Sequence, residues 1–124
     1  MSGYVTEINK ETANNPNFRT VLYTSSMSQL VVMSLRPQED IGSEVHDDVD
    51  QFIRIESGSG KAVLDGQEHS LKAGSAVVIP AGVEHNVINT SAETDLKLYT
   101  IYTPPEHPGG TVHKTKAEAE AHGH

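Results

Sequence analysis

The sequence predicts an all-β protein, a barrel or sandwich of short strands. Runs rich in Val, Ile, Leu, Thr and Tyr recur along the chain, and turns rich in Gly and Pro separate them at short intervals. The 124 residues suit one domain, which we expect to span 1–124 with the barrel core at about 20–103. Closure of these strands into a barrel would remove the exposed edges of a lone sheet.

The first half of the chain contains three predicted strands. Residues 20–24 form a short β-prone run, and 29–35 (QLVVMSL) form a stronger one. The stretch 51–55 alternates, so that Gln51, Ile53 and Ile55 share one face, which we expect to line the interior. Residues 1–17 are polar and carry little structural signal.

A hairpin and several tight turns organise the second half. Asp65-Gly66 is a two-residue hairpin signal, because a type I′ turn needs positive φ at both central positions. It joins predicted strands over 61–64 and 69–71. The later predicted elements are strands over 76–79, 85–89 and 96–103, and a short helical tail over 114–121 that is rich in Ala, Glu and Lys.

Composition excludes several classes of function. The formal net charge of −8 disfavours binding to nucleic acid, and no basic stripe offers a phosphate contact. Cys is absent, so a metal could be held only by His and oxygen-bearing side chains. No signal-like or membrane-spanning run is present, and we expect a cytoplasmic protein with no membrane partner.

The apolar content predicts self-association. Only 35% of residues are hydrophobic and 5% are aromatic, which is little for a barrel core. A second subunit covering one face would compensate, so the sequence favours a homodimer. The alternative is a monomer with an ordinary core.

The segment Gly74–Asn89 carries the most specific motif. It has the pattern G-x5-P-x-G-x2-H-x3-N without a gap, in which Pro80 and Gly82 form a corner and His85 begins the next strand. This pattern resembles the second sequence motif of the cupin superfamily, and the similarity covers about Gln29–Thr103. Small single-domain cupins described as mannose-6-phosphate-isomerase-like are the most similar group.

The resemblance implies a fold and a metal site. The fold would be a double-stranded β-helix, or jelly-roll barrel, and His85 would be a metal ligand. Aligning Gly58 with the end of the first cupin motif gives E-x-H-x4-Q-x6-G, where the family commonly has H-x-H-x3-4-E-x6-G. The implied ligands are Glu44, His46, Gln51 and His85. A competing alignment makes Asp48 the acidic ligand, and His46 is a ligand in both.

The predicted function follows from that ligand set. Two imidazoles, a carboxylate and an amide would hold Mn, Fe, Ni or Zn and leave positions open to a small-molecule substrate. We expect an isomerase or lyase type of enzyme acting on a hydroxylated or sugar-related molecule. The alternatives are an Fe(II) dioxygenase and a non-catalytic binder of metal or small ligand. Candidate catalytic residues are Glu44 as a base and Tyr99 or Tyr102 as proton donors, only one of the two tyrosines facing inward.

The other polar candidates have less specific signals. Met33 and Arg54 are possible neighbours of the site, and Asp47 and Asp50 are expected to be solvated loop acids. The remaining histidines are expected in an exposed hairpin (His69), in a surface loop that could instead line the barrel mouth (His107 and His113), and at the chain end (His122 and His124).

Overall fold

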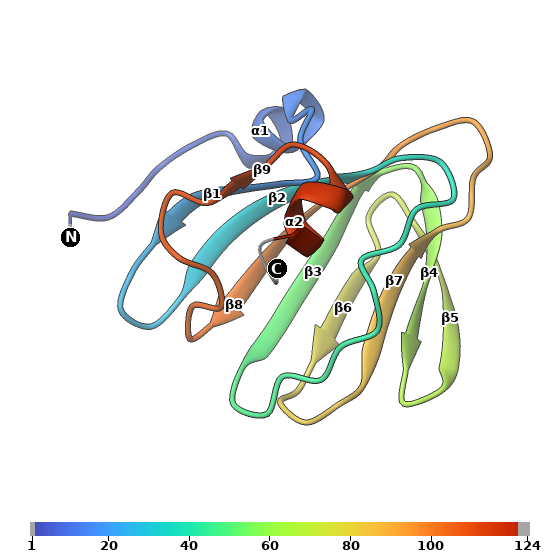
Figure 1. Cartoon of the computed structure of the whole chain (residues 1–124). Coiled ribbons are helices and arrows are strands. Elements are labelled where there is room, and N and C mark those ends of the chain that lie inside the picture. The colour runs from blue at the N-terminus through green and yellow to red at the C-terminus, as the bar shows by residue number, and fades with distance from the viewer. Residues whose placement is uncertain (1, 122–124) are drawn as a thin grey trace.

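Two facing antiparallel β-sheets of unequal size form the molecule (Figure 1). This computed structural model describes residues 2–121, so the expectation for His122 and His124 lies outside the described residues. The elements are α1 (Ile8–Asn14), β1 (Arg19–Thr24), β2 (Gln29–Leu35), β3 (Asp50–Ser57), β4 (Ser59–Leu64), β5 (Gln67–Lys72), β6 (Ala76–Ile79), β7 (His85–Asn89), β8 (Leu96–Thr103), β9 (Val112–His113) and α2 (Lys116–Ala121).

The larger sheet has the strand order β6-β3-β8-β2-β1-β9, and the smaller has β5-β4-β7. No ladder within the described residues joins β5 to β6, so the two sheets face each other without closing into a continuous hydrogen-bonded barrel. His69 of β5 lies on this open side and is exposed, as predicted. The all-β prediction with a short C-terminal helix is confirmed.

The core fills the space between the sheets. In β3, Gln51, Ile53 and Ile55 are buried on the inner face while the residues between them are only partly covered, which confirms the predicted alternation. The inner apolar side chains of the other strands include Val31, Met33, Leu35, Val77, Ile79, Val87, Leu96 and Leu98. Gln51 and His85 are buried with these apolar side chains, so these two site residues are largely shielded from water.

Local turn chemistry agrees with the sequence. Asp65 and Gly66 have φ values of 47° and 83°, as the predicted type I′ hairpin between β4 and β5 requires. Gly82 has a φ of 89°, which a residue with a side chain rarely adopts, and it turns the chain from β6 into β7. This corner places His85 at the first position of β7.

Two elements were not predicted. Helix α1 has a polar sequence and only seven residues, and it is stabilised by packing on the larger sheet, with Thr12 fully buried. Lys97 of β8 donates a hydrogen bond to the carbonyl of Asn15, just after the helix. Strand β9 has two residues and exists through its pairing with β1. Neither described helix is long and apolar enough to cross a bilayer.

Candidate functional site

The loop over residues 36–49, between β2 and β3, supplies two of the predicted site residues. Glu44 and His85 form an isolated antiparallel bridge with both backbone hydrogen bonds at 2.9 Å. The carbonyl of His46 also accepts a hydrogen bond from the N–H of Gly82 at 2.8 Å. These bonds fix the loop against the corner before β7 and bring Glu44 and His46 beside His85.

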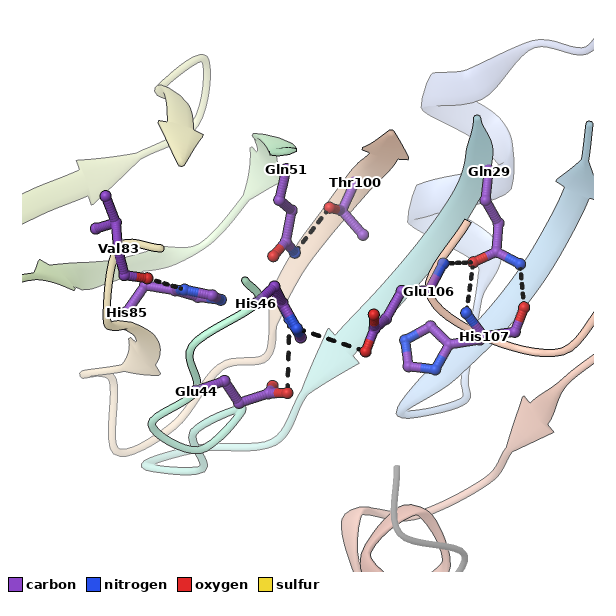
Figure 2. A network of polar contacts seen from close by, with 9 residues as sticks. All are labelled: Gln29, Glu44, His46, Gln51, Val83, His85, Thr100, Glu106 and His107. Carbon is purple, nitrogen blue, oxygen red and sulfur yellow. Dashed lines mark hydrogen bonds and ion pairs between the residues drawn. The ribbon is translucent and has the colours of Figure 1, made fainter. Parts of the chain in front are cut away.

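His46 is the centre of the polar cluster (Figure 2). Its ring centroid lies 5.2 Å from that of His85, with the two planes tilted by 49°. Its Nε2 lies 3.6 Å from Oε2 of Glu44, and its Nδ1 lies 3.4 Å from Oε2 of Glu106. The two carboxylates on either side of this ring would attract a cation.

His85 is held in one tautomer. Its Nδ1 lies 3.0 Å from the carbonyl oxygen of Val83, and because a carbonyl only accepts, Nδ1 must carry the proton. The lone pair is therefore on Nε2, at the end of the ring that Figure 2 shows directed toward His46. Donation of the second ring N–H to a carbonyl is the usual arrangement of a metal-binding histidine.

Gln51 has a buried acceptor that the protein does not satisfy. The side chain is 4% exposed, and its Nε2 donates a hydrogen bond to Oγ1 of Thr100 at 3.0 Å. Its Oε1 is buried and has no hydrogen-bond partner among residues 2–121. Figure 2 shows this oxygen on the side of the amide that faces the histidines. A native protein rarely leaves such an acceptor without a role.

The two candidate tyrosines lie on opposite faces of β8. Tyr102 points inward, is 3% exposed, and its ring meets that of His46 edge-on at 6.3 Å. Tyr99 lies on the outer face, where its ring packs against Phe52 at 6.4 Å. Of the two, the structure therefore brings only Tyr102 to the site.

Burial raises the pKa of the Tyr102 phenol well above its ordinary value. Arg19 partly offsets this rise through its charge and a hydrogen bond, while the carboxylates of Glu44 and Glu106 add to it. The hydroxyl therefore stays protonated throughout the neutral range and can donate a hydrogen bond.

Sequence reasoning missed three residues around this cluster and named a fourth, His107, only as an alternative to a surface position. Gln29 of β2 holds the loop after β8: its Oε1 accepts the N–H groups of Glu106 and His107, and its Nε2 donates to the carbonyl of His107 at 2.6 Å. The loop thereby brings Glu106 to His46 and His107 to Tyr102, with ring centroids 5.2 Å apart. The third missed residue is Arg19, on β1.

The surface-loop prediction for His107 and His113 is wrong. Both are only 7% exposed, because Gln29 holds the first and the pairing of β9 with β1 holds the second. Inward alternation in β1 and β2 was the available signal for Arg19 and Gln29. Glu106 and His107 lie in the loop after β8, where no alternation pattern indicates which side chains point inward.

The other sequence candidates lie away from the cluster. Asp48 and Asp47 are exposed, and Asp50 accepts a hydrogen bond from the N–H of Ala81, so Glu44 is the acid that the structure places beside His46. Met33 is buried in the core. Arg54 is on the outer side of the sheet with Glu56 as its partner.

The donor atoms at this site suit a divalent cation only as a mixed set of nitrogen and oxygen ligands. Among residues 2–121, no three His, Asp or Glu side chains form a metal site by themselves. The wider set nevertheless fits a borderline cation, because it combines the Nε2 lone pair of His85, the imidazole of His46, the carboxylate of Glu44 and the unsatisfied Oε1 of Gln51.

Comparison with known proteins settles the family. The family model of the cupin domain matches residues 31–102, which is more than half of the chain. The chain belongs to the cupin family. This cupin is 44% identical to BH2720 of Bacillus halodurans, whose crystal structure superposes with a TM-score of 0.93 over 95% of this chain and 93% of that one.

Two further relatives are uncharacterised proteins. YrkC of Bacillus subtilis (strain 168) is 50% identical over 95% of this cupin, and L612 of Acanthamoeba polyphaga mimivirus is 48% identical over 88% of it. The matches span 66% of the length of YrkC and 70% of that of L612. Cupins often bind a metal ion, and in this chain the ring centroids of His46 and His85 lie 5.2 Å apart.

Proposed function

We propose that this cupin is a metal-dependent enzyme of the isomerase or lyase type, acting on a small hydroxylated or sugar-related molecule. The observation that carries the proposal is the buried Oε1 of Gln51, without a partner, beside the converging rings of His46 and His85. An unsatisfied buried acceptor costs about 1–3 kcal/mol, so a ligand that takes this lone pair would explain its presence.

Four residues would hold the cation: Glu44, His46, Gln51 and His85. Mn, Fe, Ni and Zn all suit imidazole and oxygen donors. When bound, such a cation supplies Lewis acidity toward a carbonyl or hydroxyl oxygen of the substrate. Two of the donors are already oriented, since Val83 holds the His85 ring and Thr100 holds the Gln51 amide.

Proton movement would be the task of the surrounding side chains. Glu44 and Glu106 contact opposite nitrogens of His46, and their side chains are 15% and 27% exposed, so substrate could approach either carboxylate. The one that is not engaged with the cation is the base that removes a proton from substrate. Tyr102, which keeps its proton at neutral pH, donates a hydrogen bond to a substrate oxygen on the inner side.

Elemental analysis of untagged protein is the first test, because His122 and His124 would already confuse a metal-affinity preparation. We expect about one equivalent of a transition metal in the wild type and much less in Gln51→Leu and His85→Ala. His69→Ala is the matched control, since this exposed histidine lies outside the cluster and should leave the metal content unchanged.

Turnover decides between the enzyme and the other functions. The metal-loaded protein should convert at least one member of a panel of sugar phosphates and uronic acids without consuming oxygen. Oxygen uptake with the Fe(II) form would instead support a dioxygenase built on Glu44, His46 and His85. Stabilisation by metal with no turnover of any panel member would make the protein a binder and would refute the enzymatic proposal.

A further inference from the structure

Arg19 is a buried cation next to Tyr102, the tyrosine whose ring meets that of His46. It lies on β1, where it pairs in register with Met33 of β2 and His113 of β9, and it is 1% exposed. An arginine guanidinium stays charged in proteins, so burial does not neutralise it. Its charge must therefore be compensated by its surroundings.

The surroundings of Arg19 contain dipoles and rings but no close carboxylate. Its Nη1 donates to Nδ1 of His113 at 3.1 Å, and its guanidinium carbon lies 5.3 Å from the centroid of the Phe18 ring. Its Nε is buried, and no described residue forms a hydrogen bond with it. Within residues 2–121 no carboxylate oxygen lies within 4.0 Å of the guanidinium.

An anion is the group that this arrangement lacks. Buried charges in proteins are normally paired, because the desolvation of an unpaired ion costs several kcal/mol. Two N–H groups of a planar guanidinium can donate parallel hydrogen bonds to the two oxygens of a carboxylate. The Nε–H of Arg19, which no described residue accepts, could be one of these two donors. Neutral partners such as His113 and Phe18 offset only part of the cost.

Tyr102 connects Arg19 with the histidine cluster. The phenol interacts with the guanidinium through charge and a hydrogen bond, and its ring meets that of His46 edge-on. Arg19 and His46 therefore both contact the Tyr102 side chain, and a ligand bound along Tyr102 would meet both groups. Glu44 and Glu106 are negatively charged, so a cation at the histidines would strengthen the binding of an anion beside Arg19.

We propose that Arg19 recognises the carboxylate of a small hydroxy- or oxo-carboxylate substrate, whose hydroxyl or carbonyl end faces His46 and His85. This assignment rests on the proposed function for the substrate's reacting end. Arg19 is a specificity residue in this scheme, and Tyr102 shares the carboxylate with it. Neutral analogues of the same size would lose this contact and bind weakly.

The test observes Arg19 directly by NMR. The chain has three arginines, Arg19, Arg36 and Arg54, so the Nε–Hε region of a ¹⁵N spectrum contains three signals that Arg19→Lys assigns. Glycolate and gluconate are titrated into wild-type protein loaded with Zn²⁺ and into chelator-treated protein, with glycolamide and gluconamide as neutral probes. We expect an acid, but not its amide, to shift the Arg19 signal and leave those of Arg36 and Arg54 in place.

Variants provide a second readout. Arg19→Gln should raise the Kd of the acid at least tenfold, whereas Arg54→Gln, which removes a half-exposed arginine paired with Glu56, should leave it unchanged. If Arg19→Gln does not fold, the wild-type titration alone decides. The assignment would be overturned if all three arginine signals shifted equally, or if neither acid shifted any of them. Equal affinity for an acid and its amide would also overturn it.

The two proposals fail separately. An acid that shifts the Arg19 signal while the protein binds no metal supports carboxylate recognition and counts against the metal-dependent enzyme. Conversely, the protein could bind Zn²⁺ in a way that requires His85 while neither acid shifts the Arg19 signal. That result would support the metal site and refute the role of Arg19.

Discussion

The backbones of Glu44 and His85 exchange two hydrogen bonds of 2.9 Å. This pairing fixes the loop that carries Glu44 and His46 relative to strand β7, which carries His85. Glu44 comes from a long loop and His85 from the start of β7, so their side chains are 41 positions apart in the sequence. Because the bond pair is formed by backbone atoms, it sets the site geometry independently of either side chain. The same pairing carries His46, two residues on, to 5.2 Å from the His85 ring.

Replacing Gln51 with Leu should separate stability from metal binding. The substitution removes an unsatisfied acceptor from a buried position, so the free energy of unfolding of metal-free protein should change by less than about 1 kcal/mol. The affinity for the divalent metal should fall about tenfold or more, as for other lost metal contacts. Urea denaturation with chelator and a competitive metal titration measure the two effects.

Thr100→Val is the companion variant, because it removes only the hydroxyl that accepts from Nε2 of Gln51. It should weaken metal binding less than Gln51→Leu does. A loss of several kcal/mol in metal-free Gln51→Leu would show instead that the amide is a structural residue.

Tyr102 should make the protein sensitive to alkali. Burial raises the pKa of the folded-state phenol, so the unfolded state loses the proton first as the pH rises above about 10. Stability is therefore complete below that pH and declines above it, by up to about 1.4 kcal/mol per pH unit until the folded-state pKa is reached. Tyr102→Phe should remove this decline in unfolding curves recorded from pH 8 to 11.

Tyr99→Phe is the matched control, because this tyrosine lies on the outer face of the same strand. It should retain the alkaline decline of the wild type. Identical pH profiles for Tyr102→Phe and the wild type would contradict the inward, desolvated position of the Tyr102 hydroxyl.

Asp40 should make the attachment of α2 sensitive to acid. Burial tends to raise the pKa of this carboxyl, but hydrogen bonds from Asn86 and Lys116, together with the charge of Lys116, lower it overall. A lowered pKa in the folded state means that the stabilisation is present above the ordinary value near 4 and is lost as the pH falls through the folded-state value. Asp40→Asn should therefore lower the melting temperature at pH 7 and have little effect at pH 3.

Lys116→Met tests the same contact from the helix side. Lys116 of α2 donates a hydrogen bond to Asp40, which lies in the loop between β2 and β3. The melting temperature of the double variant should therefore be little lower than that of either single variant. Amide hydrogen exchange should quicken in α2 in all three proteins. Additive losses in melting temperature would mean that the two residues act separately.

The homodimer predicted from composition also has a candidate surface. Phe52, Val78, Tyr99 and Ile101 lie on the outer face of β3, β6 and β8, and Val78 is 67% exposed. We expect light scattering to give twice the chain mass of 13.4 kDa, and Val78→Lys to shift the protein toward monomer. Val45→Lys, at an exposed position in the loop between β2 and β3, is the control. A wild type that stays monomeric at high concentration would refute the prediction.

The sequence carried enough local information for most of the fold. Alternation predicted the buried face of β3, Asp65-Gly66 predicted its hairpin, and the spacing around Pro80, Gly82 and His85 predicted the cupin corner. Each of these signals depends on backbone preferences of adjacent residues, which the sequence displays directly. Helix α1 and strand β9 depend on contacts with the larger sheet and had no comparable signal.

By itself, then, the sequence determined the cupin fold and the residue types that surround His46 and His85. Only the tertiary structure decided that Tyr102 rather than Tyr99 faces the site and that Gln29 holds Glu106 against His46. It also decided that Arg19 is buried with no carboxylate oxygen within 4.0 Å in the described part of the chain. The physical reason is that burial and charge pairing depend on distances between remote segments, whereas turns and alternation are set by neighbours along the chain.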